Sequence, residues 1–175
     1  MDMSNSVQSL GGDNFRVGGQ SMDFETLVLS IQSERANLLE SQLADQAKTI
    51  QDRNALIAQA NDVLAKAKAA QNNAAANNIV GGDVNSDNAM TQFFKDNNLS
   101  FENKNSAGQI VGNKDQWDVY IQRIKNFTDK LNSSSQMDMI RLQSLMNKRD
   151  QAFEMMTNVL QKTSKLNSDI ISNMR

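Results

Sequence analysis

The chain has 175 residues and a formal net charge of −2, from 18 basic and 20 acidic residues scattered along its length, without the dense basic surface that a phosphate backbone requires of its partner. Cysteine and histidine are both absent, which excludes disulfides, thiolate nucleophiles, cysteine-bound zinc and histidine general bases. We therefore expect no enzyme, metal or cofactor.

Hydrophobic residues make up 39% of the chain and aromatic residues 5%, and there is no proline. This apolar share is low for a compact globular core. A polar chain without proline is typical of long helices that share a narrow apolar seam. No run of 18 apolar residues is present, so we expect no transmembrane segment.

The first twenty residues, MDMSNSVQSLGGDNFRVGGQ, are polar and contain glycine and serine. They lack the basic start and the apolar stretch of a cleaved signal peptide. We predict a flexible leader over residues 1–20, interpreted either as a loose terminus or as a non-cleaved export signal that is read unfolded. The glycine pairs carry no following Lys-Ser/Thr signature, so they indicate flexible joints and not a phosphate loop.

A first long helix is predicted over residues 21–77, capped by the Ser21 hydroxyl. Apolar residues recur at every seventh position, namely Met22, Leu29, Ala36, Leu43, Ile50, Ile57 and Leu64. The partner column, three residues on, contains Leu39, Ala60 and Ala67 but is interrupted by Gln46 and Arg53. Near the start of the helix, apolar residues spread around much of the circumference, so this part must be covered on more than one side. Gly81-Gly82 should end the alanine-rich stretch.

Residues 78–114 are predicted to form a small α+β head inserted between the long helices. SDNAMTQFFKDNN reads as a short helix capped by Ser86 or Asp87, and LSFEN and QIVGN could pair as a β-hairpin. The carboxylates of Asp83, Asp87 and Asp96 lack the ligand spacing of an EF-hand, so we interpret them as solvated loop side chains.

A second long helix is predicted over residues 115–175. One heptad column comprises Trp117, Ile124, Leu131, Asp138, Leu145, Ala152, Val159 and Leu166, and a second comprises Ile121, Thr128, Ser135, Leu142, Arg149, Met156, Thr163 and Ile170. A third column, Met139, Met146, Phe153 and Leu160, lies beside the first. Together they cover an arc of about 100°, wider than one partner helix can hide. Asp138 and Arg149 occupy seam positions. A charged side chain there either forms an ion pair that fixes the register of the two helices, or it is exposed at a gap in the packing.

These elements predict an all-α fold, a long antiparallel coiled-coil hairpin with a small α+β head and a flexible leader. The hairpin seam should contain Leu43, Ile50, Ile57, Leu64, Ile121, Ile124 and Leu131. A self-assembly interface is expected at Leu142, Leu145, Met146, Phe153, Met156, Leu160, Leu27 and Ile31.

The stretch from Gln116 to Arg175, and above all MDMIRLQSLMNKRDQAF within it, resembles the carboxyl-terminal helix of tip and filament proteins of type III secretion systems. The leader and SMDFETLVLSIQSERANLLESQLADQ resemble the first helix of such proteins. The resemblance implies export through a hollow needle in an unfolded state, then self-assembly outside the bacterial cell as a ring or, in EspA-like members, a helical filament. The implied partners are the needle, the translocator proteins and a cytoplasmic chaperone. The family has no catalytic residues to carry over.

Two other interpretations stay open. The chain could be a cytoplasmic chaperone or adaptor that holds a partner helix on its methionine-rich face, since methionine adapts to varied partners. It could also be a self-contained coiled-coil dimer that is not secreted.

Overall fold

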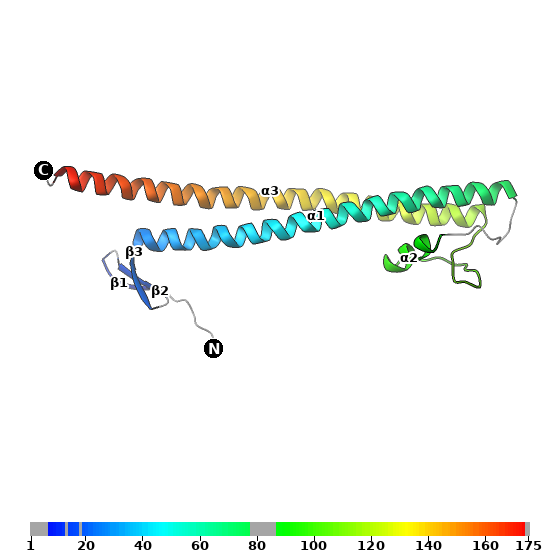
Figure 1. The fold of residues 1–175 in the computed structure, drawn as a ribbon, viewed down its shortest axis with the longest axis horizontal. Helices are drawn as coiled ribbons and strands as arrows, with labels where there is room; N and C mark the ends of the chain where they lie inside the picture. The colour runs from blue at the N-terminus through cyan, green and yellow to red at the C-terminus, as the bar shows by residue number, and fades with distance from the viewer. Residues whose placement is uncertain (1–6, 13, 18, 78–86, 174–175) are drawn as a thin grey trace. The chain divides into compact units, whose positions relative to one another are not determined.

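The computed structural model describes residues 7–12, 14–17, 19–77 and 87–173. The described chain is mostly helical: two long helices pack together, with a short helix and a small three-stranded antiparallel sheet (Figure 1). The elements follow in the order β1 (Gln8–Gly11), β2 (Asn14–Val17), β3 (Gln20–Asp23), α1 (Phe24–Asn77), α2 (Asn88–Asp96) and α3 (Lys114–Asn173). The chain divides into two compact units, residues 1–47 with 140–175 and residues 48–139, so each long helix contributes to both.

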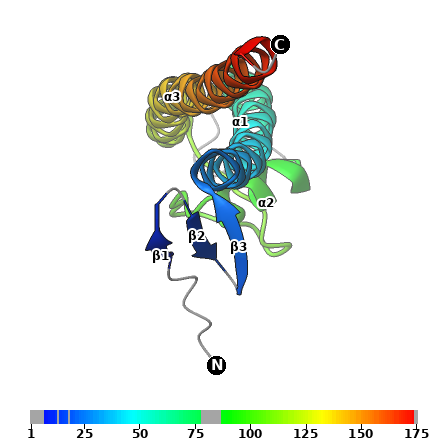
Figure 2. The same ribbon diagram turned by 90° about the vertical axis from the view of Figure 1, so that its left-hand side faces the viewer.

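The sheet in the first unit corrects the predicted leader. Its strands lie side by side in the order β1-β2-β3, each antiparallel to its neighbour (Figure 2). Gly11, Gly12 and Gly19 all have positive φ angles, of 92°, 64° and 87°, which glycine adopts without a steric penalty. The prediction of a flexible leader over residues 1–20 is therefore wrong for strands β1 and β2 and the start of β3, because these glycines serve turns instead of joints. Residues 1–6 lie outside the described part.

Helix α1 begins three residues later than predicted, and Ser21 does not cap it. Ser21 lies in β3, where it pairs with Arg16 of β2. The cap is Asp23, whose Oδ1 accepts a hydrogen bond of 2.7 Å from the backbone N–H of Thr26. This bond lowers the pKa of the Asp23 carboxyl. Phe24, the first helical residue, packs its ring 5.9 Å from that of Phe15 in β2, so the sheet and the helix start are joined by an aromatic contact.

The first unit has a sparse interior. Among its described residues, the buried apolar side chains are Leu27, Ala36, Leu39 and Ala152. Two glutamines are buried as well, Gln32 and Gln46, both in the interrupted column of α1. The Thr163 hydroxyl of α3 donates a hydrogen bond of 2.8 Å to Oε2 of Glu25 in α1. Small and polar side chains therefore make up much of this interior.

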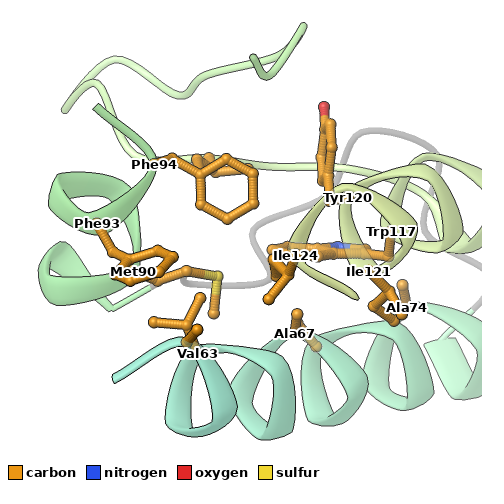
Figure 3. Close-up of a cluster of buried hydrophobic side chains, with 13 residues drawn as sticks. Val63, Ala67, Ala74, Met90, Phe93, Phe94, Trp117, Tyr120, Ile121 and Ile124 are labelled. Carbon is orange, nitrogen blue, oxygen red and sulfur yellow. The ribbon is translucent and has the colours of Figure 1, made fainter. Parts of the chain in front are cut away.

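The second unit contains the main hydrophobic core. Its long-helix segments run in opposite directions, since Arg53 pairs with Asp138 while Gln71, further along α1, hydrogen-bonds Asp118, further back along α3. The core combines α1, α2, α3 and the segment after α2, and Figure 3 shows most of its members. They are Ala60, Val63, Ala67, Ala70, Ala74, Met90, Phe93, Phe94, Ile110, Trp117, Tyr120, Ile121 and Ile124.

Aromatic edges organise this core. The ring of Tyr120 stands edge-on to Trp117 at 5.5 Å and to Phe94 at 6.1 Å. The Tyr120 hydroxyl accepts a hydrogen bond from the backbone N–H of Glu102 at 3.2 Å. Four alanines, at positions 60, 67, 70 and 74, and Val63 supply the α1 side of the core. The small alanine side chains leave room for the large rings on α2 and α3.

The middle of the chain matches the prediction in its helix but not in its hairpin. Helix α2 is capped by Asp87, whose Oδ1 accepts from the backbone N–H of Ala89 at 3.1 Å. Ser86, Asp83 and Gly81-Gly82 lie outside the described residues. Between the predicted strands LSFEN and QIVGN, the Asn103 carbonyl accepts a hydrogen bond of 3.2 Å from the Val111 N–H, and the one isolated bridge nearby joins Ile110 to Lys104, which lies in the predicted connection. Side-chain hydrogen bonds attach the segment after α2 to the rest of the unit. For example, the Thr91 hydroxyl accepts a hydrogen bond of 3.2 Å from the Ile110 N–H.

Candidate functional site

The residues predicted for the hairpin seam differ in burial between the two helices. Those on α3 are buried, namely Ile121, Ile124 and Leu131. Those on α1 are half-buried, namely Leu43, Ile50, Ile57 and Leu64. The most deeply buried α1 positions are instead the alanines of the partner column, Ala60, Ala67 and Ala74.

The two charged seam positions on α3 behave differently. Asp138 is only 8% exposed and its Oδ2 accepts from Nε of Arg53 at 2.7 Å. Arg149 pairs with its neighbour Asp150 at 2.8 Å, and the Asp150 side chain is 62% exposed. Asp138 therefore forms a partly buried cross-helix pair with Arg53, whereas the Arg149 pair is local.

The residues predicted for self-assembly fall into two groups. Met146, Phe153 and Leu160 are 42%, 42% and 55% exposed and follow one another at seven-residue spacing on α3. Leu142, Leu145 and Met156 are half-buried, and Leu27 is buried. Ile31, like the first group, is exposed, at 46%. We call Met146, Phe153 and Leu160 the α3 column.

A second exposed column lies on α1 in the same unit. Phe24, Ile31 and Leu38 are 53%, 46% and 60% exposed, again at seven-residue spacing, and we call them the α1 column. Sequence reasoning included only Ile31 among the site residues. The equal spacing of the three was the signal that could have identified Phe24 and Leu38.

The two columns are exposed apolar surface in a unit that buries few apolar side chains. Exposed apolar surface that is continuous along a helix marks an interaction site more often than single exposed residues do. Within the described residues, the pKa shifts of Asp23, Lys66 and Asp87 each arise from a helix cap or a salt bridge. In the part of the chain that the structure describes, acidic side chains do not gather in a group that could hold a metal ion.

None of the helices within the described ranges combines the length and apolarity needed to cross a bilayer. The chain matches no protein-family model, and neither a curated protein nor a solved structure is significantly similar to it.

Proposed function

We propose that this protein is a secreted structural subunit that self-assembles at the tip of a type III secretion needle, as a ring or a helical filament. The assembly would serve as a conduit or platform for translocators and effectors. In this proposal the two long helices form an antiparallel coiled-coil hairpin that serves as the subunit body. The segment around α2 is the head.

One observation carries the proposal, which is the pair of exposed heptad columns in the first unit. The α1 column and the α3 column each present three large apolar side chains between 42% and 60% exposed. A helix that is apolar beyond its seam must be covered on more than one side. Neighbouring subunits that pack their own helices against these columns would provide that cover.

The contrast with the second unit supports the same conclusion. There, seven of the core residues are fully buried within one chain, namely Ala60, Ala67, Phe94, Ile110, Trp117, Tyr120 and Ile124. That part of the chain needs no partner to bury its aromatic residues. The first unit has few buried apolar side chains and many exposed ones, so its apolar surface is available for contacts between copies.

The small sheet is compatible with export in an unfolded state. Its strands have four residues each, and such short strands are marginal without further packing. A leader whose sheet unfolds with a small change in free energy is suited to be an export signal that the secretion system recognises in the unfolded state. Together with the resemblance of Gln116–Arg175 to tip and filament proteins, this favours an exported subunit over a resident cytoplasmic protein.

The test is assembly of the purified full-length chain, followed by sedimentation velocity and negative-stain electron microscopy. Phe153→Asp and Leu160→Asp should abolish polymers, because each places a charge in the α3 column. Gln143→Asp and Gln161→Asp introduce the same charge at exposed polar positions of the same helix and should leave assembly intact. Unchanged polymers from both column variants, or a wild-type chain that stays monomeric at every concentration, would contradict the proposal.

Location separates this function from the chaperone interpretation. A tip or filament subunit should appear in the culture supernatant and lose export when residues 1–20 are deleted. A chaperone or adaptor would stay in the cell in a complex of fixed stoichiometry. A non-secreted coiled-coil dimer would sediment as a dimer over the whole concentration range and show no export.

A further inference from the structure

A groove in the second unit lies between α1 and α2, with a volume of about 650 Å³. Leu56, Val63 and Phe93 form its apolar lining. Val63 and Phe93 belong to the core, and Leu56 packs against it, so this lining is held in place. Two carboxylates also line the groove, Asp62 from α1 and Asp96 from α2. We call this the acidic groove.

The acidic groove carries more negative charge than its salt bridges neutralise. Lys66 contacts Asp62 at 3.0 Å but also Asp87 at 3.0 Å, so one lysine serves two carboxylates. Both contacts raise the pKa of Lys66, which therefore stays charged at neutral pH. Asp96 accepts a hydrogen bond of 2.6 Å from the neutral amide of Gln92, and within the described residues it has no salt bridge. The groove is thus an apolar surface beside surplus negative charge.

A surface of the opposite character runs along α3 in the first unit. Its members are all exposed and recur at spacings of seven, seven, seven and four residues: Arg141, Lys148, Met155, Lys162 and Leu166. At 100° per residue these positions fall within an arc of about 60°. We call this the basic stripe.

The basic stripe combines three cations with two large apolar side chains, since Met155 is 46% and Leu166 55% exposed. Of the nearby acidic residues, Asp150 and Glu154 project about 100° or more away from Met155 around the helix, whereas Asp169 lies beyond Leu166 at the end of the stripe. In the described part of the chain, Arg141 and Lys148 have no salt-bridge partner. The stripe therefore presents unneutralised positive charge next to exposed apolar groups.

We propose that the acidic groove of one copy binds the basic stripe of a second copy. This inference rests on the proposed self-assembly and adds which two surfaces meet. Opposite charges across an interface fix its register and speed its formation, while the apolar groups of both surfaces leave water. Because the two surfaces are different, the contact is heterologous, and such contacts build open filaments or rings instead of two-fold dimers.

Charge reversal on either side tests the contact. The groove variant is Asp62→Lys with Asp96→Lys, and the stripe variant is Arg141→Glu with Lys148→Glu, both in the full-length chain. Each should raise the concentration needed for polymers by about tenfold or more, equivalent to about 1.4 kcal/mol or more per contact. Like charges would then face each other in every contact of a pure sample.

Mixing the two variants provides the decisive measurement. In an equimolar mixture, the basic groove of one variant faces the acidic stripe of the other, and the acidic groove of the second faces the basic stripe of the first. Alternating copolymers should therefore form although neither variant polymerises alone. The matched control, Asp129→Lys with Glu40→Lys, changes two exposed carboxylates that lie outside both the groove and the stripe and should assemble as the wild type does.

The outcomes separate this inference from the proposed function. Wild-type polymers with unchanged assembly of the groove and stripe variants would overturn the groove and stripe contact and leave self-assembly standing. Loss of assembly in both variants without recovery on mixing would also overturn it. A wild-type chain that never polymerises would overturn the proposed function itself. Far-UV circular dichroism and Trp117 fluorescence identical to wild type confirm that each variant is folded.

Discussion

Arg53 and Asp138, 85 positions apart in the chain, meet at 2.7 Å between α1 and α3. Both occupy heptad positions that apolar side chains would otherwise fill. Their side chains are 25% and 11% exposed, so the pair is largely removed from water. A buried pair of this kind contributes to a defined register more reliably than to stability, because desolvation offsets much of its attraction.

Removing one partner of this pair should therefore be costly. Asp138→Ala leaves the Arg53 guanidinium partly buried without its carboxylate, and we expect the free energy of unfolding to fall by about 2–3 kcal/mol. The double variant Arg53→Leu with Asp138→Leu should recover most of that loss. Urea unfolding measures both. A single variant within about 0.5 kcal/mol of wild type would show that the pair is not desolvated in solution.

The aromatic core of the second unit predicts a large effect at Phe94. This side chain is fully buried and lies edge-on to Tyr120 and Phe101. Phe94→Ala should lower the free energy of unfolding by about 3–5 kcal/mol, since it removes buried apolar surface and leaves a cavity. The control is Phe153→Ala, where the ring is 42% exposed and the loss should be below about 1 kcal/mol. Equal losses would contradict the burial of Phe94.

The Lys66–Asp87 bridge predicts how stability depends on pH at the start of α2. The pKa of Asp87 is lowered from its ordinary value of 3.8, first by the hydrogen bond from Lys66 and then by that from the Ala89 N–H. Its contribution to stability is therefore present above about pH 4 and is lost as the pH falls through the lower folded-state pKa. The pKa of Lys66 is raised above 10.5, so its contribution is present below that pH and is lost as the pH rises through the higher folded-state pKa.

Asp87→Asn should isolate this effect. The variant should unfold at a lower urea concentration than wild type near neutral pH, and the two midpoints should converge below about pH 4 as the wild-type carboxylate protonates. A carboxyl chemical-shift titration by NMR should place the Asp87 midpoint below 3.8. A midpoint at or above that value would contradict the hydrogen bonds from Lys66 and Ala89.

The positive φ angle of Gly19 allows a test of how far the stability of the sheet depends on its turns. It has a φ angle of 87°, and a Cβ there would meet open space, so only backbone strain opposes a larger residue. Gly19→Ala should cost about 1–2 kcal/mol, enough to open strands of four residues locally. Amide exchange should accelerate at Phe15 and Ser21 but not at Ile124. Unchanged exchange in the strands would mean that the turn tolerates alanine.

The heptad pattern predicted the long helices because apolar periodicity is a local property that the sequence displays directly. It placed the start of the first helix at Ser21 and not at Phe24, because the strand containing Ser21 depends on pairing with Arg16, which a search for caps does not detect. The sheet was missed for the same reason. Phe15 and Val17 alternate with polar residues, but over only four positions, and the glycines around them were interpreted as joints.

The candidate site was predictable only in part, because spacing along one helix does not reveal which flank of the seam is covered. Phe153 and Leu160, chosen from the third column, are exposed, whereas Leu142 and Leu145, which the sequence analysis placed both in the seam columns and in the expected interface, are half-buried. The sequence analysis did not predict the acidic groove. It forms where Asp62 and Asp96 come together from two helices, and no local pattern connects those positions.

Unequal burial along the chain sets the order in which it would come apart under tension. A pull from the amino end would first separate the short strands and then act on the rest of the first unit, which has few buried apolar side chains. The ring cluster around Trp117 would resist longest. A chain drawn through a narrow pore from its amino end would therefore unfold at low force at first, and the aromatic core would require the highest force.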